Sequence, residues 1–255
     1  MSGRFNDVYP ENAYGGFTRV DGTIEFFSRL QALAKESRVI VDVGCGRGRH
    51  LEDPSQYRKT LGDLRGAGRH VIGIDVDSAA HGNPFLNEYR QIGPDFVWPV
   101  ESGLADLVFA DHMLEHVSNP EAFVAELDRV LSPTGVFAAR TPNKWGYPAL
   151  AARLVPNKAH AKVVHYVQNE RKAEDVFPTL YRMNTRSSLR NALRKCGFDC
   201  CIYSIQGEPS YFQFSHQLFR VMAWLHPLVP PTFRSSLLIF ARRSPRNRAD
   251  LIGRG

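Results

Sequence analysis

Residues 39–48, Val-Ile-Val-Asp-Val-Gly-Cys-Gly-Arg-Gly, constrain the fold more than any other part of the chain. The β-branched run has no helical spacing and predicts a short, buried strand. The glycines at alternate positions after it predict a tight turn whose bare backbone a ligand can approach. A strand that ends in such a turn and leads into a helix is typical of open, mostly parallel α/β sheets.

The rest of the chain continues this alternation of strands and helices. Apolar residues at helical spacing predict a helix over residues 22–36, with Asp21 as its N-cap, and further helices over 121–131 and 185–196. Strands are predicted over 38–44, 70–75, 87–91, 104–111, 135–141, 198–205 and 237–243. We therefore expect an α/β fold: a doubly wound, Rossmann-like, mostly parallel seven-stranded sheet with helices on both faces.

Composition sets the broad class of protein. The chain has 255 residues, 43% of them hydrophobic, which fits one large globular domain over residues 1–255. Its four cysteines form no CxxC pair, so neither a zinc site nor a disulfide framework is indicated, and we expect a reducing, cytoplasmic location. No apolar run reaches about 18 residues, and the first residues lack the apolar core of a signal peptide, so no transmembrane segment is expected.

The positive charge is concentrated near the end of the chain. The net charge is +6, and the residues from Arg234 onward hold six arginines and one aspartate. We interpret residues 242–255 as a basic, solvated tail, which could also contact phosphates or an anionic membrane surface.

The glycine turn and the end of the second predicted strand point to a ligand. The carboxyl ends of neighbouring parallel strands meet at one edge of the sheet, so Asp75 is expected beside Gly44 and Gly46. A carboxylate in that place can accept both hydroxyls of a ribose, which predicts a nucleoside site. Arg49 stands where a dinucleotide-binding turn has its third glycine, so a dinucleotide is disfavoured.

With these motifs the chain resembles the class I S-adenosylmethionine-dependent methyltransferases, and among them the ubiquinone-type O-methyltransferases. The resemblance rests on residues 42–48, 73–77, 105–120, 126–135 and 141–143, in that order. It implies S-adenosyl-L-methionine as cofactor and a methyl transfer to a small-molecule acceptor. A hydroxyl oxygen of a metabolite or sugar is the favoured acceptor atom.

The resemblance also implies roles for residues in the first two motifs. Gly44 and Gly46 would let the methionine part approach the backbone. Asp42 would orient the glycine turn or bind the amino group, and Asp75 would accept the ribose hydroxyls. Val76 would pack on the adenine face.

Three further cofactor-binding residues follow from the same resemblance. Asp95, or the backbone amide of Phe96, would meet the edge of the adenine. Asp111 would lie near the methionine amino group and the methyl sulfonium, and it could also serve as a helix N-cap.

Transfer to an alcohol benefits from a general base, and histidine suits that role near neutral pH. The candidates are His112, His116 and His165. Residues 112–116 also match the His-x-x-Glu-His pattern of a protease metal site, but their position favours the methyltransferase interpretation. We assign no metal, with a divalent ion near His112 as the alternative.

Two segments are too long for plain connections. We expect residues 144–184 and 207–232 to be insertions on the acceptor side, flanking a cofactor-binding core at 38–143 that follows an N-terminal arm and helix at 1–37. Apolar residues over 212–228 predict a helix that either covers the sheet edge or forms a dimer or membrane contact.

Two other functions remain as alternatives. The basic tail suggests a nucleic-acid-binding or RNA methyltransferase, although residues 242–255 hold none of the aromatic residues that stack on RNA bases. A non-catalytic cofactor-binding scaffold is the third possibility, and the intact glycines with Asp75 argue against it.

Overall fold

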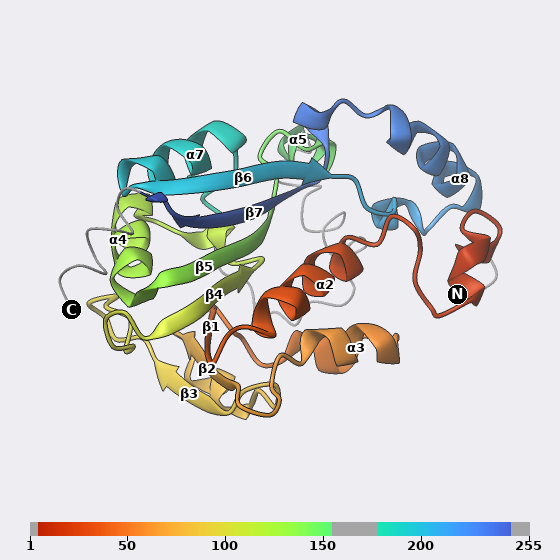
Figure 1. Cartoon of the computed structure of the whole chain (residues 1–255). Helices are drawn as coiled ribbons and strands as arrows, with labels where there is room; N and C mark the ends of the chain where they lie inside the picture. Colours follow the sequence, from red (N-terminus) through yellow and green to blue (C-terminus); the bar gives the residue numbers. More distant parts are fainter. Residues whose placement is uncertain (1–4, 155–177, 246–255) are drawn as a thin grey trace.

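A computed structural model describes residues 5–154 and 178–245. Seven strands form one sheet in the order β3-β2-β1-β4-β5-β7-β6 (Figure 1). Every pairing from β3 to β5 is parallel, while β7 runs antiparallel to both β5 and β6. The predicted doubly wound, mostly parallel seven-stranded sheet is confirmed, with strands at β1 (Val39–Val43), β2 (His70–Asp75), β3 (Glu88–Gln91), β4 (Ala105–Asp111), β5 (Leu131–Pro142), β6 (Phe198–Ile205) and β7 (Ser236–Arg243).

The predicted helices form close to their expected bounds. The Asp21 carboxylate caps the first long helix by accepting hydrogen bonds from the backbone amides of Thr23 and Ile24, as the sequence predicts. The α-helices are α2 (Gly22–Ala34), α3 (Gln56–Gly62), α4 (Pro120–Val130), α5 (Tyr147–Leu154), α7 (Arg186–Lys195) and α8 (His216–Leu225). Short 3₁₀ turns are η1 (Pro10–Ala13), η2 (Arg49–Glu52), η3 (Ser78–Gly82), η4 (Leu114–His116), η6 (Ser210–Phe212), η7 (His226–Leu228) and η8 (Pro231–Phe233).

Two apolar cores cover the two faces of the sheet. Phe26, Phe27 and Leu30 of α2 pack with Leu107 and other strand residues on one face. On the other face, side chains of α4 and α7, among them Leu127, join a second core. In Figure 1, α2 and α3 lie to the right of the strands, and α4 and α7 lie on the left. Side chains along a strand alternate between the two faces of the sheet. The same alternation decides which face the side chains near the strand ends, such as Asp42 and Asp111, point to.

The segments after β5 and β6 both leave the sheet at its carboxyl edge, where the glycine turn lies. The N-terminal arm packs beside α8, and Figure 1 shows the two side by side. Tyr9 of the arm is buried, and Phe5 and Tyr9 contact the ring of Phe219 of α8 at centroid distances of 5.2 and 6.2 Å. Phe219 belongs to neither sheet core, so α8 packs on the arm rather than covering the sheet edge.

Two arginines assigned to both the predicted strand 237–243 and the predicted basic tail belong to the strand. Arg242 and Arg243 belong to β7, and Arg243 is buried. Its guanidinium donates hydrogen bonds to the carbonyls of Leu131 and Ser132 and pairs with the Asp128 carboxylate at 3.0 Å. Arg243 is therefore a structural residue that ties the end of α4 to β7 and adds nothing to a basic surface.

Within residues 5–154 and 178–245, no helix is both long and apolar enough to span a membrane.

Candidate functional site

The glycine turn after β1 is open at Gly46, whereas the side chain of Met113 packs against Gly44. Gly44, Gly46 and Gly48 have φ values of 73°, 53° and 83°, which side chains other than glycine adopt at a cost. A Cβ at Gly46 would have no atom within 4 Å, so the backbone there faces open space. The buried side chain of Asn83 fixes the turn from below by donating hydrogen bonds to the carbonyls of Cys45 and Gly46.

Asp75 lies at the end of β2, directly beside this turn, as predicted. Its carboxylate accepts hydrogen bonds from the backbone amides of Gly46 and Asp77, each at 2.9 Å. Each carboxylate oxygen has more than one acceptor position, so both oxygens can also accept from a ribose. The hydroxyl of Tyr89 donates to the carbonyl of Asp77 at 2.9 Å and steadies the end of the strand.

A pocket of about 700 Å³ lies next to Asp75, between the ends of β2 and β3. The exposed side chains of Val76 and Phe96 form parts of its wall, and its full lining is Val76, Gln91, Ile92, Gly93, Pro94 and Phe96. Mostly apolar walls of this kind suit a flat aromatic base.

The edge contact predicted for the base involves the backbone amide of Phe96 or the Asp95 carboxylate. The amide of Phe96 donates to the carbonyl of Gly93 at 3.0 Å, so an adenine would compete with that carbonyl for the amide. The loop closes on itself there as a turn, so contact of that amide with a base stays a prediction. The exposed Asp95 carboxylate accepts a hydrogen bond from the Val97 amide at 3.3 Å and lies outside the pocket lining.

Asp42 is the unpaired acid of the site. It sits at the end of β1, partly exposed, and its carboxylate accepts no hydrogen bond from any residue that the structure describes. Burial raises the pKa of Asp42 well above its usual value, and the carboxylates of Asp111 and Asp75 raise it further. A cation placed beside Asp42 would relieve both effects.

Asp111, by contrast, is already paired. The Arg140 guanidinium binds both of its carboxylate oxygens, with Nε and Nη2 each at 2.7 Å. Burial disfavours the ionised carboxylate, but Arg140 outweighs that effect and holds the pKa of Asp111 below its usual range. The N-cap of η4 is Met113, so Asp111 does not cap a helix.

The three candidate bases are placed differently. His112 follows β4 with a φ of 56°, and its ring lies between two carboxylates: Nε2 is 3.9 Å from Asp111 and Nδ1 is 3.7 Å from Glu115. The ring of His116 is turned toward the next segment, with Nδ1 at 3.0 Å from the carbonyl of Pro178. His165 lies outside the described residues.

Glu115 anchors the turn between His112 and His116. It is buried and accepts a hydrogen bond from the Thr141 hydroxyl at 3.0 Å, and its carbonyl accepts from the amide of Leu180. Burial raises the pKa of Glu115, and the neighbouring His112 more than offsets this, so the pKa lies below its usual value. Across the described ranges, no three His, Cys, Asp or Glu side chains gather as metal ligands.

Several residues that complete the site were not predicted. Arg140 is one, and its charge within the apolar run of residues 135–141 was the available signal. Asn83 and Thr23 are others: Thr23 of α2 accepts a hydrogen bond from Arg140 at 2.9 Å. No local pattern marks Asn83 or Thr23, because each acts on a residue distant in the sequence.

These features together fit an amino-acid-linked nucleoside. Asp75 and the apolar pocket match a ribose and a base, the glycine turn admits a chain against the backbone, and Asp42 offers an unpaired carboxylate for an ammonium group.

The comparisons with known proteins agree with this geometry. Residues 17–201 match the family described as a methyltransferase domain, which is more than half of the chain. The chain belongs to this methyltransferase family. One curated relative and one solved neighbour reported below carry S-adenosylmethionine in their names, and the matched domain is an S-adenosylmethionine-dependent methyltransferase domain.

Two curated relatives of this methyltransferase match only part of the chain. A probable S-adenosylmethionine-dependent methyltransferase of Mycolicibacterium smegmatis is 31% identical over 110 residues, covering 42% of this chain and 39% of the relative. A ubiquinone biosynthesis O-methyltransferase of Paraburkholderia phytofirmans is 29% identical over 139 residues, covering 48% of this chain and 56% of the relative. The matched part thus spans about two fifths to just over half of these relatives.

Solved structures share the fold over most of the chain. An S-adenosylmethionine-dependent methyltransferase of Mesorhizobium loti has a TM-score of 0.51 at 20% identity, covering 88% of this methyltransferase and 100% of that chain. One from Archaeoglobus fulgidus has a TM-score of 0.51 at 18% identity, covering 91% and 97%. At these identities the likeness concerns the fold alone.

Proposed function

We propose that this protein transfers a methyl group from S-adenosylmethionine to a hydroxyl oxygen of a small-molecule acceptor. The observation that carries the choice of oxygen is the position of His112 at the carboxyl edge of the sheet, between the Asp111 and Glu115 carboxylates. An imidazole flanked by carboxylates is a suitable base for an alcohol. The ubiquinone biosynthesis O-methyltransferases among the relatives support the same reaction class.

The cofactor would be held by the residues of the glycine turn and its neighbours. Asp75 accepts the ribose hydroxyls, Val76 and Phe96 enclose the base, and Asp42 binds the ammonium group of the methionine part. Arg140 keeps Asp111 ionised, so Asp111 adds negative potential near Asp42 without a direct bond. When bound, the cofactor supplies an electrophilic methyl group on a sulfonium.

Besides holding the cofactor, the residues of the site must position the acceptor and remove its proton. In the proposal, one ring nitrogen of His112 accepts the hydroxyl proton as the oxygen attacks, and the flanking carboxylates stabilise the imidazolium that results. Because the left-handed backbone at His112 turns the chain sharply after β4, the ring is held at the edge rather than within the core.

Calorimetric titration with the demethylated product, S-adenosylhomocysteine, tests the cofactor site. Asp75→Ala should weaken binding by about 1–3 kcal/mol, or roughly 5- to 150-fold in Kd, because hydrogen bonds to a carboxylate are lost. Asp199→Asn, on the exposed surface of β6, should bind as the wild type does. Equal affinity in Asp75→Ala would contradict the assignment.

Transfer of a radiolabelled methyl group to a panel of phenols, catechols and sugars tests the acceptor class. Matched compounds in which an amine replaces the hydroxyl form the comparison set. Labelling of the amines with none of the hydroxyl compounds would overturn the proposal for oxygen while leaving the cofactor site intact.

A further inference from the structure

Exposed apolar side chains are concentrated in one segment after β6. Of the fifteen large apolar side chains exposed in the described part of the chain, seven fall between residues 211 and 233. Trp224 is 72% exposed and Leu228 is 67% exposed, values far above those of a packed helix. We name the α8 surface by its outward residues, Tyr211, Arg220, Val221, Trp224, Leu228 and Phe233.

The segment has two different sides. Its inner side is fixed by Phe219, which packs against Phe5 and Tyr9 of the N-terminal arm. On the outer side, Val221, Trp224 and Leu228 follow one another at three- and four-residue spacing, which places them on one face from α8 into η7. One face of α8 is therefore packed against the arm, and a second apolar face is exposed.

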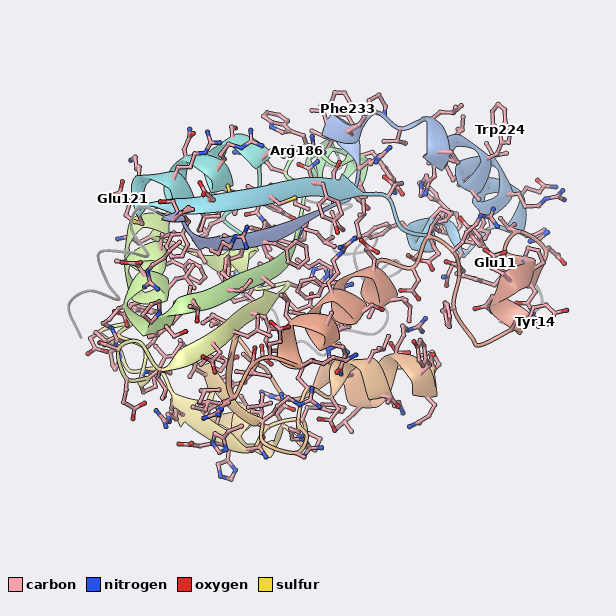
Figure 2. All side chains as sticks on the ribbon, in the orientation of Figure 1. Glu11, Tyr14, Glu121, Arg186, Trp224 and Phe233 are labelled. Atoms are coloured by element: carbon pink, nitrogen blue, oxygen red, sulfur yellow. The ribbon has the colours of Figure 1, made fainter. Side chains whose placement is uncertain are left out.

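The segment itself carries charge of one sign, while Asp7 of the N-terminal arm lies 3.6 Å from His216 at the start of α8. No acidic residue occurs between Glu208 and Asp250, while Arg220 is exposed beside Trp224 on the same helix. Figure 2 shows the side chains of Phe233 and Trp224 pointing outward along the upper margin, with Arg186 on the same side. Glu11 lies on the lower side of this region, together with Tyr14.

We propose that the α8 surface docks on an anionic phospholipid bilayer. Aromatic and aliphatic side chains beside an arginine, on a segment that holds no acidic residue of its own, are the composition that enters the headgroup region of such a membrane. Trp224 and Leu228 lie among the lipid chains near the surface, and Arg220 contacts lipid phosphates. The occupant is thus identified by the combination of an apolar face and a complementary positive charge.

A second copy of the chain fits this face less well. A two-fold contact would bring the same surface together on both partners, and the α8 surface holds Arg220 but no acidic residue that could pair with it. The anionic surface of a bilayer supplies the missing negative charge.

Co-sedimentation of the full chain with vesicles tests the proposal. We expect the protein to sediment with vesicles of phosphatidylcholine containing about one third phosphatidylglycerol at about 50 mM NaCl, and much less at about 500 mM, because salt screens the arginine contacts. Phosphatidylcholine alone should bind it more weakly. The double variant Trp224→Ser, Leu228→Ser should lose at least about tenfold in apparent affinity.

Matched variants separate docking from misfolding. Tyr14→Ser removes an aromatic ring that is 85% exposed on the other side, and it should sediment as the wild type does. Each variant should keep its thermal midpoint and its affinity for S-adenosylhomocysteine. In brominated lipid, quenching of tryptophan fluorescence should persist in Trp145→Phe and disappear in Trp224→Phe.

Three outcomes would overturn the proposal. One is no sedimentation at low salt, which would leave the face to a protein partner. Another is equal sedimentation of the double variant. The third is a concentration-dependent dimer in light scattering, lost in the double variant and unaccompanied by vesicle binding, which would assign the face to a second copy. None of these results depends on methyl transfer.

Discussion

The Arg140 guanidinium and the Asp111 carboxylate form a two-bond ion pair at the carboxyl ends of β5 and β4, with both N–O distances at 2.7 Å. The register of the sheet places the two residues directly opposite each other. The guanidinium also lies over the rings of Phe26 and Phe27, at 5.5 and 5.9 Å from their centroids. The pair therefore ties the helix α2 to the carboxyl edge of the sheet.

Replacing Arg140 should destabilise the protein most strongly at neutral pH. Arg140→Met leaves the buried Asp111 charge unpaired, which costs about 3–5 kcal/mol of unfolding free energy. The pKa of Asp111, now below its usual range, would rise through burial, so acidification would neutralise the carboxyl and shrink the penalty. Urea unfolding at neutral and acidic pH measures both effects.

In the wild type, acid has the opposite effect on the free energy of unfolding and lowers it. Since the folded pKa of Asp111 is lowered, its stabilisation is present above the unfolded value of about 3.9 and is lost as the pH falls through the folded value. The exposed ion pair between Lys195 and Glu121 offers a control, because Lys195→Met should cost at most about 1 kcal/mol. A pH-independent penalty for Arg140→Met would count against the ion pair.

The ionised carboxylate of Asp42 should lower the free energy of unfolding while it favours cofactor binding. Its folded pKa is raised, so the ionised carboxylate costs stability at neutral pH, and stability grows as the pH falls through that pKa. Asp42→Asn removes the buried charge and should raise the unfolding free energy by about 1–3 kcal/mol at neutral pH. The same change should weaken S-adenosylmethionine binding, because the ammonium group loses its partner.

Thermal unfolding with and without the cofactor measures both effects of Asp42→Asn. The variant alone should melt above the wild type, and the added cofactor should raise its midpoint by less. A lower midpoint together with unchanged cofactor affinity would show that Asp42 serves the fold and not the ligand.

His112 and His116 should differ in their effect on turnover. His112→Asn keeps a residue that tolerates the left-handed backbone and removes the base, so kcat should fall by about 100-fold or more with little change in cofactor Kd. His116→Asn should have a smaller effect, since its ring faces the carbonyl of Pro178. The reverse order, measured with any acceptor found, would move the base to His116.

Much of the fold could be predicted because local patterns and topology agree. The apolar run before Gly44 and the acid at the end of β2 predict two adjacent strands. The right-handed crossover rule then leaves few possible orders for the other strands. Asp75 could be placed for the same reason, since its position depends only on the sheet edge. The family comparison then agrees with what those motifs imply.

The contacts that the sequence did not predict are made only in the folded chain. Arg243 resembled part of a basic tail, yet it is buried because the end of α4 offers it Asp128 and two strand carbonyls. The amide of Phe96 is used by a turn that no strand pattern predicts. Asp111 could be placed at the edge, but its partner Arg140 follows 29 residues later on another strand.

His226 should make the segment after β6 sensitive to acid. The ring is buried, with Nδ1 at 3.0 Å from the carbonyl of Gly207 and Nε2 at 3.0 Å from the Tyr147 hydroxyl. A carbonyl can only accept, so Nδ1 donates and the neutral Nε2 accepts from Tyr147. Burial lowers the pKa of His226, although the contact with Gly207 acts in the opposite direction.

The lowered pKa fixes the direction of the effect of acid. Above the unfolded value of about 6.5, both states are neutral and His226 causes no pH dependence. As the pH falls below that value, the unfolded state gains the proton first, and stability is lost by up to about 1.4 kcal/mol per pH unit until the folded pKa is reached. Urea unfolding of the wild type and of His226→Gln between pH about 7.5 and about 5.5 measures this loss.

The variant His226→Gln should be less stable at neutral pH, and its stability should decline less steeply with acid. His81→Gln, at an exposed position, should keep the wild-type slope. Parallel curves for the wild type and His226→Gln would mean that another group carries the acid sensitivity.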